Sequence, residues 1–133
     1  MSLKLFCHKR VDLGGRRGLS RQISVIDAEG ASVGDFELMC AAINEDIQTA
    51  EGSGACVLDW IRRVEARELD MADVDGNAWV MYITRDKVWF EGLYSQGEGG
   101  AVSFAQYKLA VETYVRFLAD PERRPIEVPW PLA

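Results

Sequence analysis

The chain has 133 residues, of which 48% are apolar, and it carries a net charge of −6 at neutral pH. These values predict a single domain over residues 1–133 with a core of its own, and they exclude a disordered chain. The acidic excess argues against nucleic acid as a partner, because a phosphate backbone is bound by lysine and arginine. No apolar run approaches the ~18 residues of a membrane span, so we expect no membrane partner.

The N-terminal region predicts two strands joined by a loop. The stretch SLKLFC, residues 2–7, alternates along its length, with Leu3 and Leu5 on one side, and QISVID, residues 22–27, is the second candidate strand. The segment between them, residues 11–21, contains three glycines around two arginines and predicts a loop. It lacks the Gly-Lys-Ser/Thr ending of a phosphate-binding loop.

Two helices are predicted next. Residues 34–52 carry an apolar stripe at helical spacing, with Asp35 expected to cap the start and Gly52 to end the helix. Residues 52–69 carry a second stripe, with Ser53 as the expected cap. This helix places Asp59 three residues before Arg62, a spacing that favours an ion pair.

The centre of the chain predicts an antiparallel meander. An edge strand is predicted at residues 68–74, ELDMADV. The Asp75-Gly76 pair that follows it predicts a type I′ turn. A hairpin is predicted from two strands, NAWVMYIT at residues 77–84 and KVWFEGLY at residues 87–94. Because the residues on both sides of each strand are largely apolar, we expect most of both faces of the hairpin to be covered. A third helix follows over residues 103–120, opened by a capping box, and then an extended tail. The predicted fold class is therefore α+β, an antiparallel sheet of about five strands with two or three helices packed on it.

Negative charge is concentrated in the middle of the chain. Residues 35–75 contain eleven acidic and three basic side chains. We predict that the acidic residues at the end of this segment form a docking surface for a basic protein, since segregated charge steers a partner of opposite sign. An acidic surface that only contacts solvent is the alternative. The candidate partner-binding residues are Asp59, Glu65, Glu68, Asp70, Asp73 and Asp75.

The acidic segment does not match a calcium-binding loop. Aligning Gly76 with the glycine of an EF-hand loop puts Asp73 and Asp75 at two ligand positions, but Met71 and Tyr82 fall where the first and last ligands belong. Three scattered cysteines and one histidine give no zinc-binding spacing either. The sequence therefore predicts no metal site and no cofactor.

No constellation of catalytic residues is visible in the sequence. His8 is the single histidine and has no neighbouring oxyanion-hole feature, and Glu91 is the one carboxylate set in an apolar strand. We therefore expect no enzyme, and a small hydrolase that uses His8 or Glu91 is the less favoured reading. The odd cysteine count, with Cys7, Cys40 and Cys56 far apart, and the lack of a secretory signal favour the cytoplasm.

The C-terminal half resembles a known family. VWFEGLY, a glycine-rich loop, the helix VSFAQYKLAVETYVRFLADP and a proline-rich end are similar to small bacterial immunity proteins of polymorphic toxin systems, including contact-dependent growth inhibition. The resemblance covers residues 78–131. It implies a cytoplasmic, non-enzymatic protein that binds one cognate toxin domain, often a nuclease, and blocks its active site. The competing interpretation is a structural or adaptor domain that forms a homodimer through the edge strand 68–74.

Overall fold

The computed structural model describes residues 2–9 and 21–133, so most of the predicted loop at 11–21 lies outside the described residues. In this part of the chain the protein has three α-helices and two antiparallel sheets, one of three strands and one of four. The α+β class is confirmed, whereas the prediction of one sheet of about five strands is wrong. The elements are β1 (Lys4–Cys7), β2 (Ile23–Ile26), the 3-10 turn η1 (Gly34–Phe36), α1 (Glu37–Asp46), the π-helical turn η2 (Ala50–Gly54), α2 (Ala55–Glu65), β3 (Met71–Asp75), β4 (Trp79–Thr84), β5 (Lys87–Gly92), β6 (Glu98–Ser103), α3 (Phe104–Ala119) and β7 (Ile126–Pro129).

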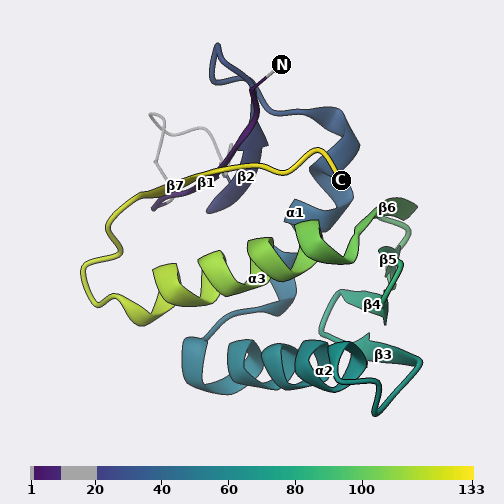
Figure 1. Ribbon diagram of the computed structural model, residues 1–133. Coiled ribbons are helices and arrows are strands. Elements are labelled where there is room, and N and C mark those ends of the chain that lie inside the picture. Colours follow the sequence, from purple (N-terminus) through teal and green to yellow (C-terminus); the bar gives the residue numbers. More distant parts are fainter. Residues whose placement is uncertain (1, 10–20) are drawn as a thin grey trace.

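The three-stranded sheet joins the two ends of the chain in the order β2-β1-β7 (Figure 1). The C-terminal tail pairs with β1 in antiparallel register, so that Lys4 lies opposite Pro129 and Cys7 opposite Ile126. Alternation places Leu5 and Cys7 on the covered side, where both are fully buried. The tail therefore completes a second sheet, which is why the predicted strands do not form one continuous sheet.

Helix α1 is shorter than its sequence pattern predicts. It ends at Asp46, because Ile47 turns to an extended conformation (φ −101°, ψ 101°) and buries its side chain in the core. The expected end at Gly52 is wrong, since residues 50–54 form the separate turn η2. Thr49 caps that turn, with its hydroxyl accepting from the amides of Gly52 and Ser53 at 3.0 and 3.3 Å.

Helices α2 and α3 bury the faces that their stripes predict. In α2, the residues Val57, Ile61 and Val64 are buried. The Ser53 hydroxyl does not cap this helix, because it accepts from the backbone amide of Gln48 at 2.8 Å. The capping box that opens α3 is present as predicted, and the helix packs between the two sheets, in contact with β1, β5 and β6.

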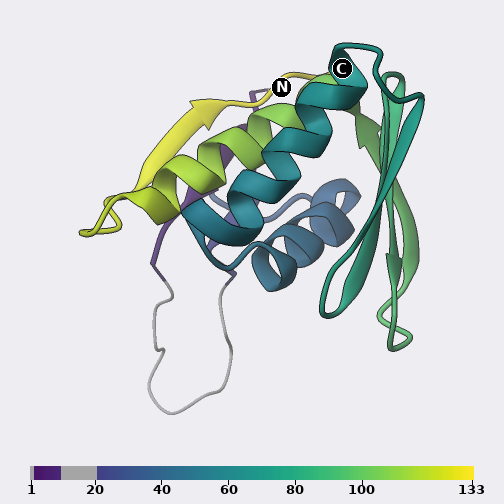
Figure 2. The ribbon, with the colours of Figure 1, turned by 90° about the horizontal axis from the view of Figure 1, so that it is seen from below.

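The four-stranded sheet runs in the order β3-β4-β5-β6, and the described helices cover one of its faces. Figure 2 shows the three helices on one side of this sheet and none of the described helices on the other. On the side of the sheet that faces the helices, the side chains of Ile83, Val88 and Phe90 are fully buried. The prediction that the hairpin is covered on most of both faces is wrong, because all three described helices lie on one side of it and two of them, α1 and α3, also pack on the three-stranded sheet. No helix in the described part of the chain combines the length and apolar character that a membrane span requires.

The turn between β3 and β4 is held by the end of α1. The Asp46 carboxylate accepts from the backbone amides of Ala78 and Trp79, each at 3.0 Å. Gly76 does not adopt the left-handed conformation that a type I′ turn needs, so the predicted turn type is wrong. A glycine is required there because a Cβ would collide with the Asp46 side chain. Burial of this carboxylate raises its pKa, an effect that the turn amides partly oppose.

Candidate protein-binding surface

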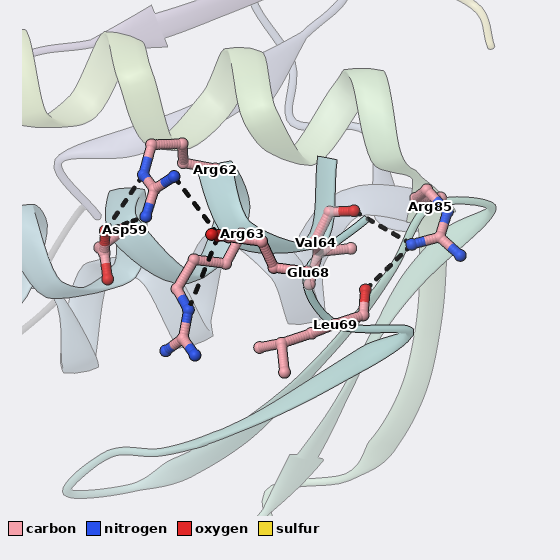
Figure 3. Close-up of polar contacts among 7 residues, drawn as sticks. All are labelled: Asp59, Arg62, Arg63, Val64, Glu68, Leu69 and Arg85. Atoms are coloured by element: carbon pink, nitrogen blue, oxygen red, sulfur yellow. Dashed lines mark hydrogen bonds and ion pairs between the residues drawn. The ribbon is translucent and has the colours of Figure 1, made fainter. Parts of the chain in front are cut away.

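Two of the predicted acidic residues belong to an ion-pair cluster on α2 and the segment after it. Arg62 lies between Asp59 and Glu68, with nitrogen–oxygen distances of 3.1 and 3.4 Å, and Arg63 approaches Glu68 to 4.0 Å (Figure 3). All four side chains are substantially exposed, so the pairs add little stability. They do offset the negative charge locally, so this part of the predicted surface is close to neutral.

Two more of the predicted residues also have basic partners. Glu65 accepts from the Lys108 ammonium group on α3 at 2.8 Å, and Asp70 accepts from the Arg85 guanidinium at 3.1 Å. Arg85 also donates to the backbone carbonyls of Val64 and Leu69 (Figure 3), at 3.1 and 2.9 Å. The main role of Arg85 is thus to hold the segment between α2 and β3 through these two carbonyls. Its ion pair with Asp70 is a further contact, and the Asp70 side chain is exposed.

The remaining two predicted residues, Asp73 and Asp75, lie on the uncovered side of β3. Neither forms an ion pair with a basic side chain in the described part of the chain. Within residues 2–9 and 21–133, the six candidates therefore separate into four that have basic partners and two that do not. Asp73 and Asp75 point to the same side, because they are two residues apart on one strand.

Strand register identifies the other residues on this side of the sheet. Asp73 lies opposite Tyr82, and Tyr82 opposite Trp89. Asp75 lies opposite Val80 in a second row, which continues to two further carboxylates on β5 and β6. We call this side the open face. Its residues are Met71, Asp73, Asp75, Val80, Tyr82, Thr84, Lys87, Trp89, Glu91 and Glu98.

A stacked aromatic pair occupies the middle of the open face. The rings of Tyr82 and Trp89 have centroids 5.4 Å apart and planes inclined by 14°, and both side chains are half-buried. The Tyr82 hydroxyl donates to Glu91 at 2.9 Å, which raises the pKa of the phenol. The Lys87 ammonium lies 5.3 Å from the Trp89 ring centroid, within the range of a cation–π contact.

Four carboxylates surround this pair without a described basic partner. They are Asp73, Asp75, Glu91 and Glu98, contributed by three different strands. Lys87 is the basic residue within the open face, and its nearest described contact is the Trp89 ring. The face therefore combines rigid aromatic area with a net negative charge, which suits binding of a cationic protein surface.

The residues considered for catalysis are not gathered into one site. His8 follows β1, where its ring stacks on Phe6 at 4.6 Å, while Glu91 lies on β5 in the other sheet. Burial raises the pKa of the Cys7 and Cys40 thiols to about 12, so neither is an activated nucleophile. Over residues 2–9 and 21–133, no group of three or more His, Cys, Asp or Glu side chains is arranged to hold a metal ion.

Sequence reasoning missed the aromatic part of the open face and the carboxylate at position 98. Tyr82, Trp89 and Glu91 alternate with core residues along the hairpin, and that alternation was the available signal. Because both sets of alternating residues are largely apolar, the pattern predicts two covered faces and does not distinguish the exposed one. Comparison of the chain with protein-family models, with curated proteins and with solved structures finds no match.

Proposed function

We propose that this protein is a cytoplasmic immunity protein that binds a cognate bacterial toxin domain, a nuclease, and blocks its active site with an acidic surface. The observation that carries the proposal is the open face, where four carboxylates that have no basic partner among the described residues surround an aromatic pair. A nuclease cleft must be basic to bind phosphate, so an inhibitor that presents carboxylates has the charge of the substrate. The resemblance of residues 78–131 to immunity proteins supports the same function.

The open face supplies both components that a tight protein interface needs. Carboxylates steer the encounter and suppress wrong partners, whereas affinity comes from a few desolvated anchors, among which tyrosine and tryptophan are enriched. Tyr82 and Trp89 sit on the two central strands and pair directly with each other, and a bulge interrupts the β5–β6 register at Trp89. Asp59, Glu65, Glu68 and Asp70 already have basic partners, so we assign them to the rim of the surface.

The proposal is tested with a charge reversal and a matched control. The test variant is Asp73→Lys with Asp75→Lys, and the control is Asp59→Lys with Glu68→Lys, which changes the net charge equally but at paired positions. The probe is the basic nuclease domain of a candidate cognate toxin, and the readouts are nuclease inhibition and association rate. We expect the test variant to lose about tenfold or more in association rate and the control less than about threefold.

Salt dependence provides the second readout. The association rate of the unmodified protein should fall as ionic strength rises, because screening shortens the reach of the carboxylates. An equal effect of the two charge reversals, or a nuclease that stays active when mixed with an excess of the unmodified protein, would refute the proposal.

The homodimer alternative has one observation in its favour. Among the described strands, β3 has a single neighbour in its sheet, so its other edge is available for pairing with a second copy. Asp73 and Asp75 oppose such pairing, because two copies would bring like charges together. Sedimentation of the isolated protein separates the two functions: a stable dimer that Ala72→Pro on β3 disrupts would favour the adaptor role.

A further inference from the structure

The aromatic pair on the open face has one ring surface that is not stacked on another ring. Tyr82 lies on β4 between Asp73 on β3 and Trp89 on β5. Because Trp89 covers one side of the Tyr82 ring, the other side of that ring is directed toward β3. The carboxylates of Asp73 and Asp75 are on that same strand and the same face.

A cation already occupies part of this platform. The Lys87 ammonium lies 5.3 Å from the centroid of the Trp89 ring, in a contact formed within the chain. Aromatic rings attract cations through the negative potential of their faces, and the effect grows when carboxylates stand nearby. The Tyr82 side of the pair has no corresponding basic side chain in the described residues, although Asp73, Asp75 and Glu91 are all close enough to act on its hydroxyl electrostatically.

We propose that the Tyr82 ring, together with Asp73 and Asp75, is a docking site for an arginine side chain of the partner protein. This inference rests on the proposed function and specifies the group that the open face recognises. A planar guanidinium can stack on an aromatic ring and donate in plane to carboxylates at the same time, whereas a lysine ammonium is a point charge without a stacking face. The site therefore distinguishes arginine from lysine at equal charge.

The hydrogen bond between Tyr82 and Glu91 positions the ring for this role. The phenol donates to the Glu91 carboxylate at 2.9 Å, which fixes the ring against rotation away from the sheet and prepares it for stacking. Glu91 is thus a positioning residue, while Tyr82, Asp73 and Asp75 contact the guanidinium. Trp89 supports the ring from its other side.

The test compares two peptides of equal charge, Ac-Arg-Arg-Arg-NH2 and Ac-Lys-Lys-Lys-NH2. Each is titrated into the full-length protein at low salt, and binding is followed by NMR through the side-chain signals of Tyr82 and Trp89. We expect the arginine peptide to bind about threefold more tightly, the preference that a solvent-exposed cation–π contact provides. Tyr82→Ala should abolish the preference, whereas Tyr82→Phe, which keeps the ring but loses the hydrogen bond to Glu91, should reduce the preference without abolishing it.

Charge-removing variants separate stacking from electrostatics. Asp73→Asn with Asp75→Asn should weaken both peptides, whereas the control Asp59→Asn with Glu68→Asn should leave both nearly unchanged. Equal binding of the two peptides by the unmodified protein, or a preference that survives Tyr82→Ala, would overturn the inference. Equal peptide binding alongside successful nuclease inhibition would reject the arginine site alone, and an arginine preference without nuclease inhibition would reject only the immunity function.

Discussion

Replacing Gly76 with alanine tests the contact between the end of α1 and the β3–β4 turn. The added Cβ would lie 2.8 Å from the Asp46 Cβ and still closer to the Asp46 carboxylate. Carbon atoms at van der Waals contact are about 3.5–4.0 Å apart, so the Asp46 side chain must move by about 1 Å. That movement breaks the hydrogen bonds to the amides of Ala78 and Trp79, which are 3.0 Å long in the native turn.

The magnitude follows from these two hydrogen bonds. A hydrogen bond to a charged acceptor contributes about 1.5–3 kcal/mol, and overpacking adds about 1–3 kcal/mol where the surroundings cannot relax. Relaxation of the surroundings and hydrogen bonds to water will recover part of the lost free energy. We therefore expect Gly76→Ala to lower the free energy of unfolding by about 2–4 kcal/mol. The backbone conformation itself is not the cause, since Gly76 is outside the left-handed region.

A double-mutant cycle with Asp46→Gly isolates the cause. Glycine is chosen at position 46 because alanine would keep the Cβ that lies 2.8 Å from the new side chain. In the Asp46→Gly protein, Gly76→Ala should cost less than about 0.5 kcal/mol, or stabilise by reducing the entropy of the unfolded chain. Urea unfolding followed by tryptophan fluorescence gives the four free energies. If Gly76→Ala costs the same in both backgrounds, the turn is not set by Asp46 and the reasoning fails.

Two further predictions concern thiol reactivity and the α2–β3 connection. At pH 8, a thiol reagent should modify the exposed Cys56 quickly. Cys7 and Cys40 are buried and their pKa values are raised to about 12, so both should stay unreacted until the protein is unfolded. Three fast-reacting thiols in the native protein would contradict the burial of Cys7 and Cys40. Arg85→Ala should lower the free energy of unfolding by about 1–3 kcal/mol because two partly buried carbonyls lose their donor. Asp70→Asn should change it by less than about 0.5 kcal/mol, since the Asp70 side chain is 98% exposed, and equal effects of the two variants in urea unfolding would contradict this assignment.

The candidate site was only partly predictable because ion pairs depend on residues that are distant in sequence. The spacing of Asp59 and Arg62 on one helix indicates their contact directly. No local pattern indicates that Lys108, on another helix, pairs with Glu65. Which carboxylates lack a basic partner is therefore a property of the packed helices, and the six acidic candidates could not be divided before the helices were placed.

Local sequence patterns determined the element types, and most of the residues that face the core, without help from the structure. Alternation predicts that Leu5 and Ile83 are buried, and helical spacing predicts the same for Ile43. The α+β class follows from these patterns, because each period is a short-range consequence of backbone geometry. The capping box that opens α3 is local in the same sense.

Tertiary structure alone decided how the strands divide into two sheets and which face of the hairpin stays open. Pairing of Lys4 with Pro129 brings the two ends of the chain together, and no periodicity within either segment encodes that contact. The hairpin is apolar on both sides, so its covered face is chosen by where α1, α2 and α3 pack. Because α1 and α3 also cover the three-stranded sheet, no described helix packs on the other side of the hairpin, and the Tyr82–Trp89 pair lies there.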